Sequence, residues 1–437
     1  MDRRNFGSAF AFDRAHVWHP YASLRDPPPV RLARAAQGVE IELADGRRLI
    51  DAVSSWWCVA HGHNHPAIVE AIRRQAGRLC HVMFGGFSHE PAVELAQRIA
   101  AIAPQGLNKV FFADSGSISV EVAVKMAIQY QQAKGRPSRC KMVSLKGGYH
   151  GDTACAMALS DPDGMHVLFR GMMPQHHFVS KPEGGLAALP KWTSELERLV
   201  DEHDGEIAGM ICEPVFQAAN AMNFYPPEYL VEMRRICDER DLVLVFDEIA
   251  AGLWRTGPRW AHERAGVSPD AMCIGKALTG GHMTLAASVA SEHVADVISN
   301  GDVGAFMHGP TYMANPLACA AANASLELFA RDDYGAMARR IGDEFNVALP
   351  PLAVLPNVRD VRVTGAVGIV EVERLPSRDY IDRVIDETGV WLRPFANFIY
   401  AMPPLVSDTA TIRRVSEALA AMAALPPGPE PIGDFHE

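Results

Sequence analysis

The sequence predicts an α/β fold whose largest part is a mainly parallel sheet wrapped by helices. Short apolar runs that resemble strands alternate with periodic, helix-like segments through the middle of the chain. Two charged residues, Asp247 and Lys276, each come just after such a run, which indicates that both project from one edge of the sheet. A chain of 437 residues is long for a single hydrophobic core, so we expect two or more domains.

The middle of the chain supplies the elements of the predicted large domain, residues 61–325. Strands are predicted at residues 109–112, 141–145, 207–212, 242–246, 271–274 and 285–289. The segments between them, such as residues 117–133 and 227–240, have helical periodicity.

The two ends of the chain are predicted to form a smaller α+β domain. Residues 326–425 contain a strand pair at 358–363 and 366–372 and helices at 378–387 and 409–425. Residues 1–60 complete the domain with strands at 40–43 and 48–51, on either side of a turn at Asp45-Gly46. Residues 426–437 are rich in proline, so we expect a flexible tail there.

Composition excludes several classes of protein. The formal charge of −11 argues against a surface that binds nucleic acid or anionic membrane. No apolar stretch approaches the roughly 20 residues that span a bilayer, and the first residues do not resemble a secretion signal. The eight cysteines include no Cys-x-x-Cys pair, so a reduced, cytoplasmic protein is expected and a disulfide framework is not.

The pair formed by Lys276 and Asp247 indicates the chemistry. A lysine can hold the aldehyde of pyridoxal phosphate as a Schiff base. An aspartate beside it can keep the pyridine nitrogen protonated, which makes the ring an electron sink. Because the two residues are predicted at one edge of the sheet, we expect a pyridoxal phosphate site there.

Two further segments follow predicted strands and suit the same cofactor. Gly116 and Ser117 open a helix, where backbone N–H groups and the helix dipole favour a phosphate. The alternative is a well-capped helix without a ligand. Tyr149 follows two glycines and is expected to lie flat on the cofactor ring, with His150 and Asp152 orienting polar groups beside it. The alternative is a glycine-rich turn with a surface histidine.

Three more segments are candidates for binding. Thr311 lies in a loop of small and polar residues and is a possible phosphate donor, or else part of a structural loop. Trp56 and Trp57 are adjacent and suit either the wall of an apolar substrate slot or core packing. Arg393 stands in an apolar segment, where it needs an anionic partner: a substrate carboxylate, or else an internal salt bridge.

The alternation of His61, His63 and His65 raises the question of a metal site. Asn-His-Pro at residues 64–66 is typical of a helix start, and no cysteine or acidic residue nearby completes a ligand set. We therefore expect no metal.

Together these segments resemble the fold-type I, class III aminotransferases that depend on pyridoxal 5'-phosphate. The class resemblance rests on Phe246-Asp-Glu-Ile-Ala, Arg255-Thr-Gly and Gly275-Lys. A narrower resemblance, from about residue 15 to 425, is to the aminotransferases of biotin biosynthesis that use S-adenosylmethionine and 8-amino-7-oxononanoate. It rests on Trp18-His-Pro-Tyr, Ser54-Ser-Trp-Trp, His81-Val-Met-Phe-Gly-Gly, Asp114-Ser-Gly-Ser, Gly147-Gly-Tyr-His-Gly-Asp, His308-Gly-Pro-Thr and Trp391-Leu-Arg-Pro-Phe.

The resemblance implies a seven-stranded large sheet, a homodimer with shared sites, and a role for each matching residue. Catalytic roles would fall to Lys276 as the Schiff-base lysine, Asp247 on the pyridinium nitrogen and Tyr149 stacked on the ring. The phosphate would be bound by Gly116 and Ser117 and by Pro310 and Thr311 of the partner subunit. Substrate would be bound by Tyr21, Trp56, Gly309 and Arg393, with Arg393 on the oxononanoate carboxylate.

Two segments depart from the pattern of the family. Residues 218–222 carry alanines and an asparagine where glycines are usual, and Trp254 replaces a glycine. If these loops line the pocket entrance, the amino donor and even the acceptor can differ. The alternatives are therefore an ω-amino acid or amine transaminase that uses pyruvate, a racemase or aminomutase with the same cofactor, and a non-catalytic protein on this fold.

Overall fold

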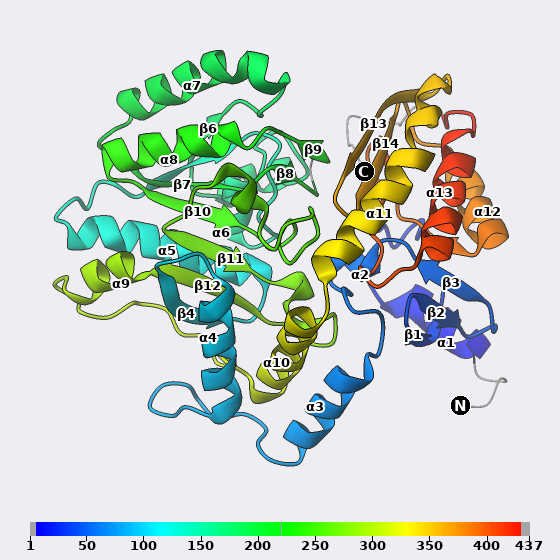
Figure 1. Cartoon of the computed structure of the whole chain (residues 1–437), viewed down its shortest axis with the longest axis horizontal. Helices are drawn as coiled ribbons and strands as arrows, with labels where there is room; N and C mark the ends of the chain where they lie inside the picture. The colour runs from blue at the N-terminus through cyan, green and yellow to red at the C-terminus, as the bar shows by residue number, and fades with distance from the viewer. Residues whose placement is uncertain (1–5, 220, 430–437) are drawn as a thin grey trace.

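The large sheet is seven-stranded and mainly parallel, as predicted. The structure, a computed structural model, describes residues 6–219 and 221–429 (Figure 1). The strand order is β4-β12-β11-β10-β7-β5-β6, and only β12 runs antiparallel to its neighbours within this sheet. The strands are β4 (Leu107–Ala113), β5 (Lys141–Leu145), β6 (His177–Val179), β7 (Ile207–Cys212), β10 (Val243–Asp247), β11 (Ala271–Ile274) and β12 (Ala286–Ser291).

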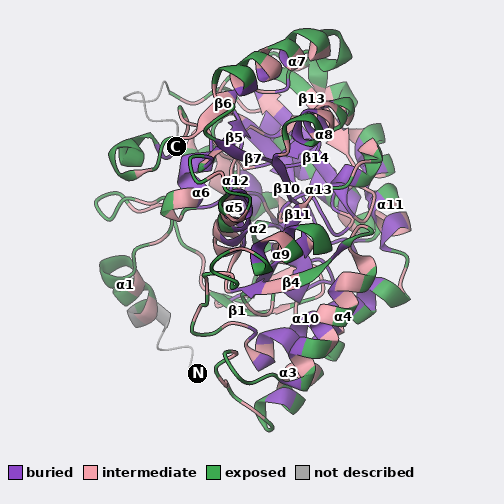
Figure 2. Ribbon diagram, turned by 90° about the vertical axis from the view of Figure 1, so that its left-hand side faces the viewer, coloured by how far each residue is buried: buried purple, intermediate pink, exposed green. Residues whose placement is uncertain are grey.

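Helices cover both faces of this sheet because side chains alternate between the faces along each strand. Val243 and Val245 of β10 pack in one cluster with α5, whereas Leu244 and Phe246 pack in another with α8. Burial is accordingly concentrated on the strands, and the outer helix faces are exposed (Figure 2). The helices of this part are α3 (Pro66–Ala76), α4 (Glu90–Ile102), α5 (Gly116–Ala133), α6 (Ala154–Leu159), α7 (Gly185–Glu202), α8 (Glu228–Arg240), α9 (Glu292–Ser299) and α10 (Pro316–Arg331).

Strands from the two ends of the chain pair with each other, as expected for a region built from both termini. Ile50 of β3 lies opposite Val390 of β15 in a parallel pair. This sheet contains β1 (Ala33–Gln37), β2 (Glu40–Leu43), β3 (Arg48–Asp51) and β15 (Val390–Trp391); a second contains β13 (Val358–Thr364), β14 (Val367–Val372) and β16 (Phe398–Ala401). The helices here are α1 (Phe6–His16), α11 (Tyr334–Ala348), α12 (Arg378–Thr388) and α13 (Thr409–Ala423).

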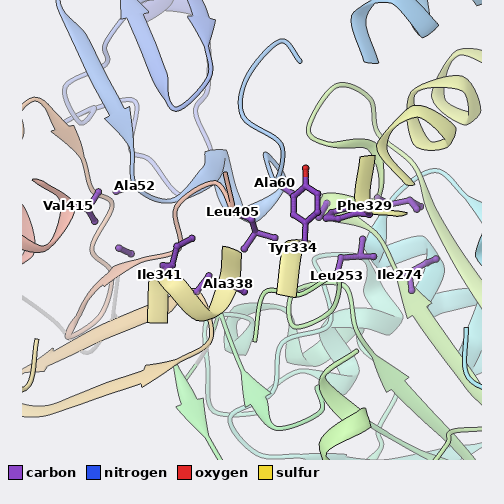
Figure 3. Close-up of a cluster of buried hydrophobic side chains, with 14 of the residues drawn as sticks. Ala52, Ala60, Leu253, Ile274, Phe329, Tyr334, Ala338, Ile341, Leu405 and Val415 are labelled. Atoms are coloured by element: carbon purple, nitrogen blue, oxygen red, sulfur yellow. The ribbon is translucent and has the colours of Figure 1, made fainter. Parts of the chain in front are cut away.

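One hydrophobic core runs from the large sheet into the C-terminal helices. It joins Leu253 and Ile274 to Phe329 of α10 and to Ile341 of α11 (Figure 3). Short elements complete the fold, namely α2 (Ser54–Trp57), β8 (Phe216–Gln217) and β9 (Asn223–Phe224). No helix in the described ranges is both long and apolar enough to cross a bilayer.

The predicted strands match observed ones to within a few residues at their ends, but the observed strands β1, β6, β8, β9, β15 and β16 were not predicted. β6 was not predicted, because three residues are too few to show a period of two. The predicted tail begins with an ordered contact, since the N–H of Gly428 donates to the carbonyl of Leu375 at 2.9 Å. Residues 430–437 of that tail lie outside the described residues.

Candidate active site

The predicted cofactor residues gather where the parallel strands end. Asp247 ends β10 and lies opposite Cys273 of the adjacent parallel strand β11, two residues before Gly275-Lys276. The segments that follow β4, β5 and β7 emerge at this same edge, because those strands run parallel to β10. Sequence reasoning therefore located Asp247 and Lys276 correctly.

Asp247 is a buried carboxylate with two hydrogen-bond partners. One oxygen, Oδ2, lies 2.8 Å from Nδ1 of His150, and the other, Oδ1, accepts the N–H of Ile249 at 3.1 Å. Asp247 is 4% exposed and His150 is 3% exposed. Since the imidazole is itself buried, it fixes the plane of the carboxylate. His150 thus acts on Asp247, whereas the sequence placed it only beside Tyr149.

Lys276 has the surroundings of a reactive amine. Burial lowers the pKa of its amine, and the nearby charges of Asp247 and Glu213 oppose that shift only in part. Its Nζ lies 4.8 Å from the ring centroid of Trp57, which is buried. The backbone of Lys276 has φ of +42°, in the left-handed region that only glycine adopts without strain.

A chain of buried polar contacts holds the segment that carries Lys276. The hydroxyl of Ser325 donates to the carbonyl of Ala277 at 3.3 Å, and its Oγ lies 2.8 Å from Nε2 of His61. The other ring nitrogen of His61 contacts the hydroxyl of Tyr334. Burial lowers the pKa of His61 to about 3, so the ring is neutral near pH 7. No sequence motif indicates this network, because its members come from separate elements.

The start of α5 faces the loop that follows β5. Asp152 donates its N–H to Oγ of Ser117 at 3.3 Å, which joins the two segments. Gly151 has φ of +123°, and a Cβ atom there would lie 2.0 Å from Ser117 Oγ, so only glycine permits this approach. Gly116 packs against Ile249, where an added Cβ would lie 3.1 Å from Cδ1.

Tyr149 belongs to a network centred on Asp152. Oδ2 of Asp152 accepts the hydroxyls of Tyr149 at 3.1 Å and Tyr21 at 2.9 Å, and Oδ1 lies 2.9 Å from Nε2 of His166. The hydrogen bond from His166 is the main cause that lowers the pKa of Asp152. Tyr149 and Tyr21 are thereby brought together, although they are far apart in the sequence.

Glu213 is a buried acid that sequence reasoning did not select. Its two oxygens each accept a backbone N–H at 3.0 Å, one from Tyr149 and one from Ala218. Burial raises the pKa of Glu213 to about 7. It positions Tyr149 through the backbone, and its place just after β7 was the available signal.

Trp56 and Arg393 form a second group. The guanidinium of Arg393 lies over the Trp56 ring at 5.2 Å, and Tyr21 packs edge-on against that ring at 6.4 Å. None of the described carboxylates lies within ion-pair distance of Arg393, so the alternative of an internal salt bridge is not supported. The 44% exposure of Trp56 leaves its ring open to a ligand.

The 308–311 loop lies apart from these groups within the single chain. Its contacts are with α5, where Lys125 Nζ lies 3.0 Å from Nδ1 of His308. Gly309 and Thr311 are exposed, and Pro310 is half-buried. The single chain therefore does not bring these three residues to Lys276.

The alternating histidines have separate partners. His61 belongs to the Ser325 network, His63 lies 2.9 Å from Asp51, and His65 caps α3 by accepting the N–H of Ala67. Each has a structural contact of its own.

The departures from the family pattern lie in packed positions. Trp254 is partly buried and stacks on Phe329 of α10 at 5.0 Å, where it packs against the hydrophobic core. Ala218 and Met222 are fully buried. Asn220 lies outside the described residues.

Comparisons with known proteins agree with this geometry. A family model described as class-III aminotransferase matches residues 21–423. The chain is 44% identical over 423 residues to adenosylmethionine-8-amino-7-oxononanoate aminotransferase of Mycobacterium leprae, across 95% of this chain and 96% of that protein. It is 41% identical over 414 residues to the protein of the same name from Buchnera aphidicola, across 94% and 96%.

Solved structures give the same result. The crystal structure of adenosylmethionine-8-amino-7-oxononanoate aminotransferase from Methanocaldococcus jannaschii matches with a TM-score of 0.88 and 30% identity, across 96% of this chain and 99% of that one. An (S)-enantioselective omega-transaminase from Thermomicrobium roseum also matches with a TM-score of 0.88, at 28% identity across 96% and 98%. The chain therefore belongs to the class-III aminotransferase family of pyridoxal-phosphate-dependent enzymes.

Proposed function

We propose that this enzyme transfers an amino group from S-adenosylmethionine to 8-amino-7-oxononanoate, giving 7,8-diaminononanoate for biotin synthesis. The observation that carries the proposal is Arg393, which lies over the open Trp56 ring and pairs with no carboxylate among residues 6–219 and 221–429. A guanidinium in that position suits a substrate with an apolar chain and a terminal carboxylate. Relatives that are 41% to 44% identical over most of their length carry the name of this activity.

The residues at the sheet edge fit pyridoxal 5'-phosphate as the cofactor. When bound, this group supplies an electrophilic aldehyde and an electron-withdrawing ring. Asp247 would hold the pyridine nitrogen, Tyr149 would stack on the ring, and the N–H groups of Gly116 and Ser117 would bind the phosphate. The buried pair of His150 and Asp247 supports this fit, because a fixed carboxylate is what a protonated ring nitrogen requires.

Lys276 would serve in two roles. Burial lowers the pKa of its amine, which increases the neutral fraction that can attack an aldehyde. Once the donor amine replaces it, the same amine is free to move a proton to or from the substrate carbon. The contact between Ser325 and Ala277 would keep that amine within reach.

One pocket would accept the two substrates in turn. Arg393 would bind the oxononanoate carboxylate, and Trp56 and Tyr21 would line the path of its chain. The donor has a different charge pattern, so it would use the aromatic walls and Asp152 and would not depend on Arg393. The packing of Trp254 on Phe329 supports a structural role for this residue, which would leave the donor unchanged.

A homodimer would complete the phosphate site. Exposed apolar side chains surround the 309–311 loop, with Met83, Phe87, Met307 and Tyr312 each about 60% exposed or more. A second copy of the chain would cover these side chains and bring its Pro310 and Thr311 to Ser117. The enzyme is proposed to work in the cytoplasm.

A half-reaction test separates this function from its rivals. The cofactor-loaded enzyme is mixed with S-adenosylmethionine, lysine, alanine or an arylalkylamine, and the visible absorbance of the bound cofactor is followed. Loss with S-adenosylmethionine, restored by 8-amino-7-oxononanoate, is the expected result. Loss only with another amine, restored by pyruvate, would assign the enzyme to the amine transaminases. Lys276→Ala is the control, and unchanged turnover in it would overturn the cofactor assignment.

A further inference from the structure

We propose that His177, His203 and Glu206 form a binding site for a zinc ion. The three side chains come from two elements: His177 begins β6, and the other two lie in the turn between α7 and β7. Their ligand atoms all lie within 4.8 Å of one another. The site is separate from Lys276 and its neighbours, and sequence reasoning expected no metal.

The spacing of the ligand atoms approaches that of a tetrahedral zinc site. Nε2 of His177 lies 3.4 Å from Oε2 of Glu206, and Nδ1 of His203 lies 3.7 Å from Oε1. Two ligands bound to tetrahedral zinc at 2.0–2.2 Å are about 3.3–3.5 Å apart. The two distances run to different oxygens of Glu206 and the two imidazoles are stacked, so one ring must rotate before both nitrogens can face a single ion.

One ligand nitrogen has only an imperfect polar contact. Nε2 of His177 is shielded from solvent, and its approach to Oε2 of Glu206 at 3.4 Å does not have the geometry of a hydrogen bond. Its ring stacks on His203 with centroids 4.0 Å apart. Shielded polar atoms normally have a well-formed partner, and a metal ion bound between this nitrogen and the carboxylate would supply one.

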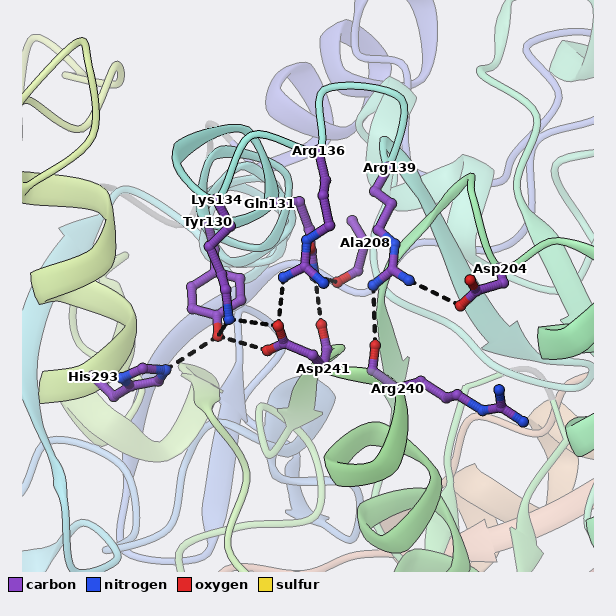
Figure 4. Close-up of polar contacts among 10 residues, drawn as sticks. All are labelled: Tyr130, Gln131, Lys134, Arg136, Arg139, Asp204, Ala208, Arg240, Asp241 and His293. Carbon is purple, nitrogen blue, oxygen red and sulfur yellow. Dashed lines mark hydrogen bonds and ion pairs between the residues drawn. The ribbon is translucent and has the colours of Figure 1, made fainter.

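The backbone around the three ligands is fixed. The carbonyl of Glu206 accepts the N–H groups of Cys140 and Lys141, each at 2.8 Å. Arg139, which is nearly buried, donates to Asp204 at 2.8 Å and to the carbonyl of Arg240 at 3.0 Å, so the turn is tied to the rest of the fold (Figure 4).

The strand that bears His177 is fixed as well. The neighbouring His176 turns the other way, and its Nδ1 accepts the N–H of Met142 at 3.2 Å. The ligands are therefore held close together before any ion binds, which reduces the ordering that binding requires.

Two imidazoles and a carboxylate suit zinc better than magnesium or calcium, which prefer oxygen ligands. Three protein ligands leave a fourth position for water, so binding is expected to be weaker than in closed sites with four protein ligands. The ion would join the short edge strand β6 to the α7–β7 turn. It would thus stabilise an edge of the large sheet, where β6 contributes only three residues to the pairing with β5.

The test is a zinc titration of the chelator-treated, cofactor-loaded enzyme against a chromophoric zinc indicator. We expect one ion per chain in the wild type. His177→Gln and His203→Gln should each weaken binding by more than about tenfold, since even changes outside the ligand set have that effect. Cobalt in place of zinc should give the visible bands of a tetrahedral ion, and His177→Gln should remove them. Aminotransferase activity and circular dichroism report that the variants are folded.

Two controls make the outcome decisive. His293→Gln removes an exposed histidine from α9, and Cys140→Ser removes an exposed thiol near the turn. Both are expected to bind zinc as the wild type does. Equal zinc affinity in the wild type and His177→Gln would overturn the proposal, as would loss of binding in Cys140→Ser alone.

Discussion

Replacing His150 with alanine tests whether this buried imidazole holds Asp247 in place. The imidazole is the one side chain among the described residues that bonds to the Asp247 carboxylate. In the alanine variant, Asp247 keeps only the N–H of Ile249. Because the carboxylate is 4% exposed, water cannot easily replace the lost partner.

The expected loss in the free energy of unfolding follows from this geometry. Removing a hydrogen-bond donor from a buried carboxylate costs about 1.5–3 kcal/mol, since that acceptor oxygen is left without a partner. His150→Asn is the matched control, because its amide nitrogen stands at nearly the same distance from Cβ as Nδ1 and can still donate to Asp247. We expect the asparagine variant to keep at least about half of the free energy of unfolding that the alanine variant loses, since a hydrogen bond to a charged group contributes roughly 1–3 kcal/mol.

Urea unfolding of the cofactor-free protein, at one fixed protein concentration, measures these free energies. The affinity for pyridoxal phosphate, measured by absorbance, should fall more in the alanine variant than in the asparagine variant. A loss below about 1 kcal/mol in the alanine variant would refute the reasoning. Equal losses in the two variants would show that the imidazole acts by filling space rather than by donating.

Three other predictions follow from the structure. Burial lowers the pKa of His61 to about 3 in the folded chain, so between about pH 6.5 and pH 4 the unfolded chain binds a proton at this residue and the folded chain does not. The wild-type free energy of unfolding, measured in urea, should therefore fall as the pH drops from about 6.5 towards 4. The His61→Gln variant should show a smaller fall. Arg393→Ala should raise the KM for 8-amino-7-oxononanoate about 10- to 100-fold but leave the S-adenosylmethionine half-reaction nearly unchanged, whereas equal effects on both would count against a carboxylate clamp. Trp254→Gly should lower the free energy of unfolding by about 1–3 kcal/mol, because the packing on Phe329 is lost. The KM values for both substrates should stay within about twofold of wild type, and a changed donor preference would show that Trp254 contacts the substrate.

The large sheet and its edge were predictable because buried parallel strands leave continuous apolar runs in the sequence. Residues 243–246 and 271–274 show this directly: Asp247 follows the first run at once, and Lys276 follows the second after one glycine. The smaller sheets were predictable as pairs, from turns such as Asp45-Gly46. The partner strand β15 was not predictable, because two residues carry no pattern and the pairing spans most of the chain.

The supporting contacts of the site could not be predicted in the same way. His61, Ser325 and Tyr334 lie far apart in the sequence, and none stands in a motif that indicates a shared role. Glu213 was overlooked because an acid after a strand has many uses, and only the structure shows its two backbone donors. The packing of Trp254 could not be predicted either, because its partner Phe329 lies 75 residues further along the chain.

The pair of tryptophans shows why local sequence rules fail at this site. All four residues of α2, Ser54 to Trp57, have φ between +46° and +73°, so this turn is left-handed. Each such residue costs roughly 1–2 kcal/mol, and tertiary contacts must offset the sum. Ser54 donates to the carbonyl of Met402 at 2.6 Å, and Ser55 donates to Asp51 at 2.7 Å.

These contacts tie the turn to β3 and to the segment after β16, so strands from both ends of the chain are needed to hold it. The strained turn places Trp56 beneath Arg393 and the adjacent Trp57 beside Lys276. In the proposed function, these two neighbouring residues would serve the substrate end and the amine end of one site. Strain of this kind persists where the surrounding structure over-determines it, which indicates that the positions of the two rings matter to the reaction.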